Sequence, residues 1–385
     1  MKKTKKLIIL FMLLSCFFII ISSASAADFR VKQKTSHDDI TKWMKKAKKG
    51  DNLIFTSSNY TLTDGILISK DITVRSTKNT KIHYNKNKTM FYVIANKVTF
   101  SHLTLNHNGQ GSVEFDQNGN LISRNIFAVV SASKDTTAKK IDFYKVKINA
   151  KKSYVLGIDI PLWNGSVRNS RINLKGHEGS GIKSEQWTGN LVNSYVSTTG
   201  TFSVAVRSVY WSGNVKNSKI YNTAIFHTGG VPTGLLFPFG KGTISKTLVK
   251  VPNGTALRLD KNIKVTACSL FSKKGFTSHY KFLPDLSLNI KKIKRSGNTY
   301  SIKVYNNNSA NQFGSSKQCH LGVKIGKYVK TVKVKPLTFG QSTTVKVTIP
   351  KKYVSKKYTK IVKVDYYNKI KEEFKDNNIV RFNYI

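Results

Sequence analysis

Three segments of the sequence repeat one pattern at a fixed interval. They are residues 163–172 (WNGSVRNSRI), 187–196 (WTGNLVNSYV) and 211–220 (WSGNVKNSKI), and each starts 24 residues after the one before it. A tryptophan, a glycine, an asparagine and a serine keep this step in all three copies. A period of this length indicates a small structural unit that buries its apolar face only by stacking on its neighbours.

Each copy contains short alternating runs and no helical pattern. One run follows the glycine, as at Val167 and Ile172, and a second precedes the tryptophan, as at Ile158 and Ile160. Gly, Asn and Ser separate these runs, which is typical of strands joined by tight bends. The sequence therefore predicts an all-β fold in which each copy is one turn of a parallel β-helix.

In such a helix, equivalent side chains of successive turns lie above one another. We therefore expect the repeated polar residues to form structural ladders along the axis, with the asparagines stacked inside. The expected ladder residues are Asn169, Asn193, Asn217, Ser170, Ser194 and Ser218.

Residues 1–26 are typical of a signal peptide. Four lysines precede an apolar run from Leu7 to Ile21, and a small-residue cleavage site follows at Ala24 to Ala26. The apolar run is shorter than the roughly 20 residues of a membrane span. We expect export to the cell surface or the extracellular space, and no transmembrane segment in the mature chain.

The chain is strongly basic. Its formal charge is +46, and loss of the four leader lysines lowers this to +42. Such a charge predicts attraction to polyanions such as acidic polysaccharide or cell-wall polymer, without specific nucleic-acid recognition. A general lysine bias explains it equally well, because the lysines are spread along the whole chain. Cys268 and Cys319 lie in different predicted domains, so we expect no disulfide framework.

Residues 27–275 are expected to form the β-helix domain. A short helix capped by Asp38 or Asp39 and ended by Gly50 covers its first turn. Two excursions are expected from the stack, at residues 107–120 and 227–242. The opening of this domain, with Lys49-Gly50-Asp51 followed by short strands, resembles the right-handed parallel β-helix proteins, a superfamily that contains pectate lyases and many cell-surface proteins.

Residues 284–385 differ from the repeat, and residues 276–283 form a linker by position. Period-two alternation, as in Tyr300, Ile302 and Val304, predicts an antiparallel sandwich of immunoglobulin type. The Pro-Asp-Leu opening at 284–286 and the Asp-Asn-Asn ending at 376–378 resemble the CARDB family of prokaryotic surface domains. A β-helix followed by such a module is similar to adhesin-like proteins of methanogenic archaea.

The repeat also places charged residues in one outward column. This column contains Asp159, Lys183 and Arg207 at 24-residue steps, and we expect Arg258 and Asp260 to continue it. The resemblance to polysaccharide lyases implies calcium-binding carboxylates and a basic catalytic residue on such a face, whereas hydrolases of this fold use paired Asp residues. A neutralising ladder of opposite charges is the competing interpretation.

The repeated tryptophans allow two interpretations. Trp163, Trp187 and Trp211 form either an aromatic strip that binds sugars or a buried stack at a corner of each turn. We expect no metal site and no cofactor; calcium is the one candidate ion, through the resemblance to lyases.

We favour a non-catalytic adhesin-like protein whose β-helix face binds carbohydrate or cell-wall polymer. A polysaccharide lyase or glycoside hydrolase acting on an acidic polysaccharide is the alternative. A purely structural envelope component is the third hypothesis.

Overall fold

The structure is a computed structural model. It describes residues 26–115, 121–201, 203–225, 231–272, 276–278, 284–306, 315–338, 340–355, 357–372 and 376–383. The predicted signal peptide, except for its last residue Ala26, lies outside the described residues.

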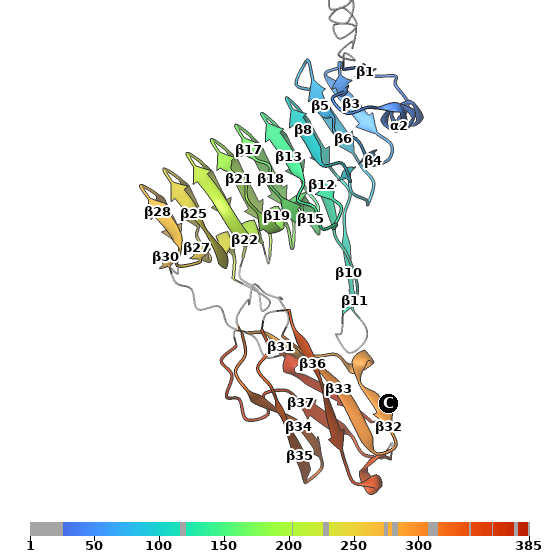
Figure 1. Ribbon diagram of the computed structural model, residues 1–385, viewed down its shortest axis with the longest axis vertical. Helices are drawn as coiled ribbons and strands as arrows, with labels where there is room; N and C mark the ends of the chain where they lie inside the picture. Colours follow the sequence, from blue (N-terminus) through green and yellow to red (C-terminus); the bar gives the residue numbers. More distant parts are fainter. Residues whose placement is uncertain are drawn as a thin grey trace, which may run out of the picture.

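The first domain is a parallel β-helix, as the repeat predicted (Figure 1). Its turns contribute strands to two sheets, and the larger sheet runs over two faces of the stack because β19 and β22 continue from one face to the next. The nine-stranded sheet, called sheet B below, consists of β3 (Asn59–Leu62), β6 (Lys81–Tyr84), β9 (Thr104–His107), β14 (Lys147–Ala150), β18 (Arg171–Lys175), β21 (Tyr195–Thr199), β23 (Lys219–Asn222), β26 (Leu248–Val251) and β29 (Ser269–Ser272).

The nineteen-stranded sheet is called sheet A. Its first face consists of β4 (Ile66–Ile68), β7 (Phe91–Val93), β12 (Phe127–Ala132), β15 (Val155–Asp159), β19 (Ser180–Trp187), β22 (Val204–Lys216), β24 (Thr233–Phe237), β27 (Thr255–Leu259) and β30 (Phe276–Ser278). Its second face consists of β1 (Asp28–Val31), β2 (Asn52–Phe55), β5 (Thr73–Ser76), β8 (Lys97–Ser101), β13 (Lys140–Tyr144), β16 (Leu162–Trp163), β17 (Val167–Arg168), the end of β19, β20 (Leu191–Val192), the end of β22, β25 (Phe239–Ser245) and β28 (Ile263–Thr266).

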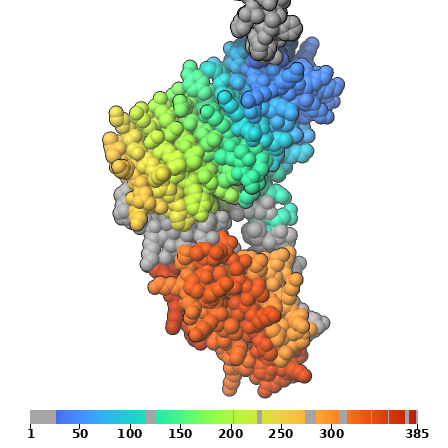
Figure 2. Space-filling model, in the orientation of Figure 1, coloured from blue at the N-terminus to red at the C-terminus, as the bar shows by residue number. Residues whose placement is uncertain are grey.

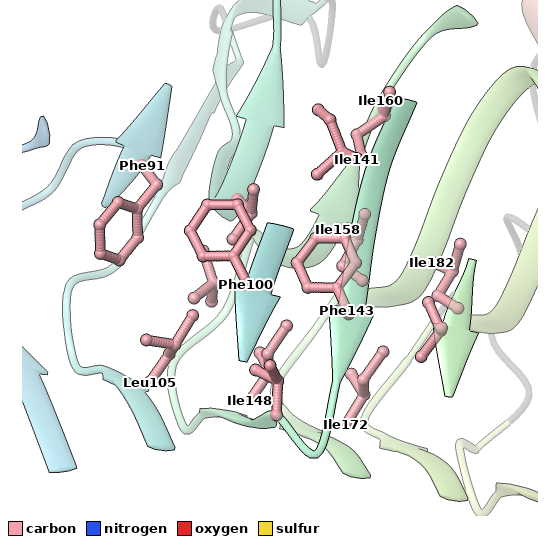
Figure 3. Close-up of a cluster of buried hydrophobic side chains, with 14 of the residues drawn as sticks. Phe91, Phe100, Leu105, Ile141, Phe143, Ile148, Ile158, Ile160, Ile172 and Ile182 are labelled. Carbon is pink, nitrogen blue, oxygen red and sulfur yellow. The ribbon is translucent and has the colours of Figure 1, made fainter. Parts of the chain in front are cut away.

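The core runs through the middle of the stack. Alternate side chains of each strand point inward, so that Leu105, Ile148 and Ile172 follow one another in register along sheet B (Figure 3). On the facing side the rings of Phe100 and Phe143 stack at 5.3 Å. Figure 2 shows the sequence colours succeeding one another in bands along this domain, as expected where each turn packs on its neighbours.

A helix covers the first turn. Helix α2 (His37–Lys46) packs Ile40 and Met44 into the core. Its N-cap is Ser36, whose side chain accepts from the backbone of Asp39 while the Asp39 carboxylate accepts from the backbone of Ser36. The predicted cap at Asp38 or Asp39 was therefore wrong in position, because Asp39 completes a capping box that starts three residues earlier.

The turn before each sheet B strand from β6 onward contains one residue in the left-handed conformation. Its φ lies between 47° and 55°, and it precedes the strand by two residues in every case. The eight residues are Asn79, His102, Lys145, Asn169, Asn193, Asn217, Lys246 and Ala267. Asparagine adopts this conformation at low cost, which accounts for its place in the repeat.

The asparagines of the repeat are consequently in register from turn to turn, but their side chains are exposed. The expectation of an inward asparagine stack was wrong. The buried ladder consists of the residues that follow them, namely Ser170, Ser194 and Ser218, continued by Thr247.

The first excursion, predicted at residues 107–120, was placed correctly only in part: His107 ends β9 of sheet B, residues 116–120 lie outside the described residues, and a hairpin extends to Asn125. β10 (Ser112–Phe115) and β11 (Leu121–Asn125) pair antiparallel and project from the stack in Figure 1. The second was placed wrongly in part, because residues 233–237 and 239–242 belong to β24 and β25 of sheet A, while residues 227–230 lie outside the described residues. Residues 276–278 of the expected linker form β30, which pairs with β27.

The C-terminal domain contains two antiparallel sheets with a hydrophobic core of their own. One sheet consists of β31 (Leu286–Leu288), β32 (Lys294–Ser296), β33 (Thr299–Asn306) and β36 (Ser342–Thr348). The other consists of β34 (Cys319–Ile325), β35 (Tyr328–Val334), β37 (Lys360–Lys363) and β38 (Ile379–Phe382). The predicted sandwich is confirmed. Cys268 and Cys319 are both free thiols.

Candidate functional site

The predicted charged column lies on the first face of sheet A. The strand register places Asp159 beside Lys183 and Lys183 beside Arg207. The Asp159 Oδ2 and Lys183 Nζ atoms are 3.7 Å apart, and both side chains are partly exposed. These three candidates are therefore brought together as the period predicted.

A second ion pair lies close to this column. Lys134 Nζ is 2.8 Å from Glu185 Oε1. Its hydrogen bond and charge interaction with Glu185 raise the pKa of Lys134, and Asp159 adds to this effect. Burial raises the pKa of Asp159, while Lys183 and Arg207 oppose that shift. The column thus mixes both signs of charge, which is the arrangement of a stabilising ladder.

The other two candidates do not join this group. Arg258 follows in the same column, but Leu236 lies between it and Arg207, and Arg258 is only 2% exposed. Asp260 lies in the turn after β27, where its carboxylate accepts from the backbone N–H groups of Gly240 and Asn262 at 3.3 and 2.8 Å.

The tryptophans form a buried stack. All three are at most 1% exposed, and the rings of Trp163 and Trp187 lie 4.7 Å apart and nearly parallel. Their Nε1 atoms donate to the carbonyl oxygens of Ile141 and Gly165. The interpretation of Trp163, Trp187 and Trp211 as a sugar-binding strip is therefore wrong, because none of these rings presents a face to solvent.

The outer face of sheet B has a different composition. Its nine strands contain no Asp or Glu, and they carry six cations. These cations are Lys81, Lys147, Arg171, Lys175, Lys219 and Lys250, and each is exposed. The turns before β14 and β26 add Lys145 and Lys246 at the left-handed position.

The cations of sheet B follow one another along the axis. Lys147 is in register with Arg171, Arg171 with Tyr195, and Tyr195 with Lys219. Neighbouring parallel strands are about 4.8 Å apart. Lys147 and Arg171 are thus adjacent like charges, and no sheet B strand supplies a carboxylate to compensate them.

Aromatic and amide side chains accompany these cations. The Arg171 guanidinium lies 4.3 Å from the centre of the Tyr195 ring, and Tyr195 stacks on Tyr221 at 5.3 Å. In the neighbouring column, Asn173 donates to Asn149 and Asn149 to Asn106, at 3.0 and 2.8 Å. These hydrogen bonds order the three asparagine side chains along the face.

These residues were not among the predicted site residues, although the sequence contains a signal for them. Arg171, Tyr195 and Lys219 are spaced by the same 24 residues as the tryptophans. Aligning every position of the repeat, and asking which columns exclude acids, would have identified the face.

Among the described residues, no three His, Cys, Asp or Glu side chains gather where they could hold a metal ion. Within the same part of the chain, no helix has the length and apolar character needed to cross a lipid bilayer.

Comparison with known proteins identifies one domain. Residues 283–382 match the CARDB family model, so this part of the chain is a CARDB domain. No curated protein sequence matches the chain.

Two solved structures are similar to this chain at low identity. The PL6 family alginate lyase AlyGC is 10% identical with a TM-score of 0.34, over 66% of this chain and 39% of that protein. The Dettilon tailspike protein is 13% identical with a TM-score of 0.22, over 79% of this chain and 83% of that protein. This chain thus spans well under half the length of the alginate lyase. At these values neither likeness bears on activity.

Proposed function

We propose that this protein is a non-catalytic, adhesin-like protein of the cell surface or extracellular space that binds an anionic polysaccharide or cell-wall polymer through the outer face of sheet B. The observation that carries the proposal is the adjacency of Lys147 and Arg171 on a sheet whose nine strands contain no carboxylate. Stability alone favours an opposite charge at such a position, as at Asp159 and Lys183.

A polymer suits this face better than a small ion. The cations recur along the axis in an extended row, and the parallel turns repeat at about 4.8 Å. An extended polyanion lying along the stack contacts several of these cations at once, so its affinity exceeds that of any single contact. Tyr195 and Tyr221, both partly exposed, offer ring faces to the apolar side of sugar rings.

The remaining parts of the chain fit this role. Residues 1–26 provide export, and the CARDB domain acts as a spacer or attachment module beyond the β-helix. Both assignments are parts of the proposal.

Binding to immobilised polygalacturonate and alginate, with neutral dextran as the reference, tests the proposal. We expect binding to both polyanions that weakens steeply as the salt concentration rises, because the screening length between exposed charges falls from about 30 Å at 0.01 M to about 8 Å at 0.15 M. The variant Lys147→Ala/Arg171→Ala/Lys219→Ala should lose most of this binding. A matched variant, Lys324→Ala/Lys330→Ala/Lys346→Ala, removes the same charge from exposed positions of the CARDB domain and should retain it. Equal loss in both variants would contradict the role of sheet B.

A lyase or hydrolase that uses the Asp159 column is the second candidate. It is favoured by the two cations that lie in register with a carboxylate whose pKa is raised by burial. The same polyanions incubated with the protein, followed by analysis for unsaturated or shortened products, separate the two functions. Product that disappears in Arg207→Ala would establish the enzyme, and intact polymer is the outcome expected of a binding protein.

A further inference from the structure

A shallow groove crosses sheet A where β19 and β22 turn from its first face to its second and where β25 begins. Its volume is about 580 Å³, within the roughly 300–1,000 Å³ of clefts that bind small ligands. The side chains that line it include Gln186, Tyr210, Ser212, Lys241, Asp260 and Asn262. None of these belongs to sheet B, so the groove and the cationic face are separate surfaces.

An exposed aromatic ring forms one wall of the groove. Tyr210 is 53% exposed, although its neighbour Trp211 is buried. Its ring stacks on Phe239 of the next turn at 5.4 Å and 23°, and Gln186 of the preceding turn is its register partner. Phe239 covers one face of the ring, while more than half of the residue stays open to solvent and can contact an apolar surface of a ligand.

The polar groups around this ring are of several kinds. Gln186 and Asn262 offer amide donors and acceptors, and Ser212 offers a hydroxyl. The Asp260 carboxylate is fixed by its hydrogen bonds from the backbone of Gly240 and Asn262, and each of its oxygens keeps further acceptor capacity. Lys241 contributes one positive charge against the one negative charge of Asp260, so the charges of the lining cancel.

This combination matches one ligand chemistry. A pyranose ring has an apolar face that stacks on an aromatic ring and a rim of hydroxyls that both donate and accept. We propose that the groove is a binding site for a short neutral oligosaccharide, with one pyranose ring lying against Tyr210 and its hydroxyls bonded to Gln186, Asp260 and Asn262. The site goes beyond the polyanion contact of sheet B, because it recognises sugar units by shape and hydrogen bonding and does not depend on ligand charge.

We expect the groove to bind its oligosaccharide without hydrolysing a glycosidic bond. Cleavage of a glycosidic bond ordinarily uses two carboxyl groups on either side of it, whereas Asp260 is the one carboxylate among the described residues that line the groove. That carboxylate is also engaged with two backbone donors.

The test is titration of the full chain with cello-, manno-, xylo- and galacto-tetraose at high salt, where contacts made through exposed charge are screened. Saturation-transfer NMR gives the sugar protons in contact, and calorimetry gives the affinity. At least one tetraose should bind, with its ring C–H protons receiving the strongest transfer. Tyr210→Ala should weaken this binding roughly tenfold or more, as the loss of a central aromatic contact commonly does.

Two further variants provide a second test of the groove and a control. Gln186→Ala, at an exposed position, should also weaken binding, and Tyr92→Ala, which removes another exposed tyrosine of sheet A, should leave it unchanged. No binding to any of the four tetraoses, or equal affinity in Tyr210→Ala and the unaltered protein, would overturn the proposal. Neither outcome would contradict the proposed polyanion site on sheet B, because that site is tested separately by binding to charged polymers at low salt.

Discussion

The backbone N–H of Ser170 donates to the hydroxyl oxygen of Ser194, one turn further along the axis, at 3.1 Å. The same Ser194 hydroxyl donates to the carbonyl of Val192 at 2.8 Å. Ser194 in turn donates from its own backbone to Ser218, and Ser218 to Thr247. These side chains are buried, so the ladder satisfies backbone groups at a corner where the strands have ended.

Ser194→Ala tests this ladder. The change leaves the N–H of Ser170 buried without its acceptor, and an unsatisfied buried donor costs about 1–3 kcal/mol. We expect the free energy of unfolding of the β-helix to fall by that amount in urea denaturation followed by far-UV circular dichroism. Asn193→Gly is the control, because glycine also adopts the left-handed conformation of that exposed neighbour. Equal stability of Ser194→Ala and the control would contradict the structural role of the hydroxyl.

Trp187→Leu tests the buried stack. The indole packs against Trp163 and donates to Gly165, so the smaller side chain loses contacts and leaves a cavity. A loss of about 2–5 kcal/mol is expected for such a change in a core. Because the CARDB domain has a separate core, calorimetry should show a lower Tm for the β-helix transition only. An unchanged β-helix transition would show that the stack contributes little.

His107 predicts a pH dependence of stability. The imidazole is buried beside Tyr84, and its Nε2–H donates to the carbonyl of Lys88 at 2.8 Å. Burial lowers the pKa of His107 below its usual 6.5. As the pH falls below about 6.5, the unfolded chain takes up a proton before the folded chain does, so this residue's contribution to stability is lost.

The variant His107→Phe keeps a ring beside Tyr84 and removes the titration. Its Tm should decline less between pH 7 and pH 5 than that of the unaltered protein, even if it starts from a lower value. Parallel Tm curves across this range would mean that His107 does not contribute to the pH dependence.

The repeat was enough to predict the β-helix, because three successive copies at a 24-residue step place equivalent strands of successive turns in register. The packing direction of individual columns was harder to predict. Counted from the buried Val167, strand alternation predicts that Asn169 points inward and Ser170 outward. The structure shows the opposite, because the left-handed conformation of Asn169 reverses the alternation. Periodicity alone carries no information on that reversal.

The bounds of the second excursion were also predicted wrongly from local sequence alone. Gly229, Gly230, Pro232 and Pro238 suggested a loop over residues 227–242, but residues 233–237 form β24. Its five residues are buried, and two of them, Leu235 and Phe237, pack in the main core. The local turn signal was overridden by pairing with β22 and β27, a long-range contact that single-sequence patterns do not reveal.

The candidate site was predicted only in part. The register of Asp159, Lys183 and Arg207 followed from the period, whereas the burial of Arg258 depends on neighbours that the repeat does not specify. The cationic face of sheet B was not predicted, because the candidates came from the one repeat column that combines a carboxylate with cations, as lyase sites do. The binding surface proposed above is distinguished by strands that contain no acidic residue.

The most direct test of the sheet B account is lysine footprinting by reductive methylation, read by mass spectrometry with and without alginate at low salt. The account predicts that alginate protects Lys81, Lys147, Lys219 and Lys250 of sheet B, while Lys324, Lys330 and Lys346 of the CARDB domain react as they do in the free protein. Protection spread evenly over both groups, or confined to the CARDB domain, would contradict it.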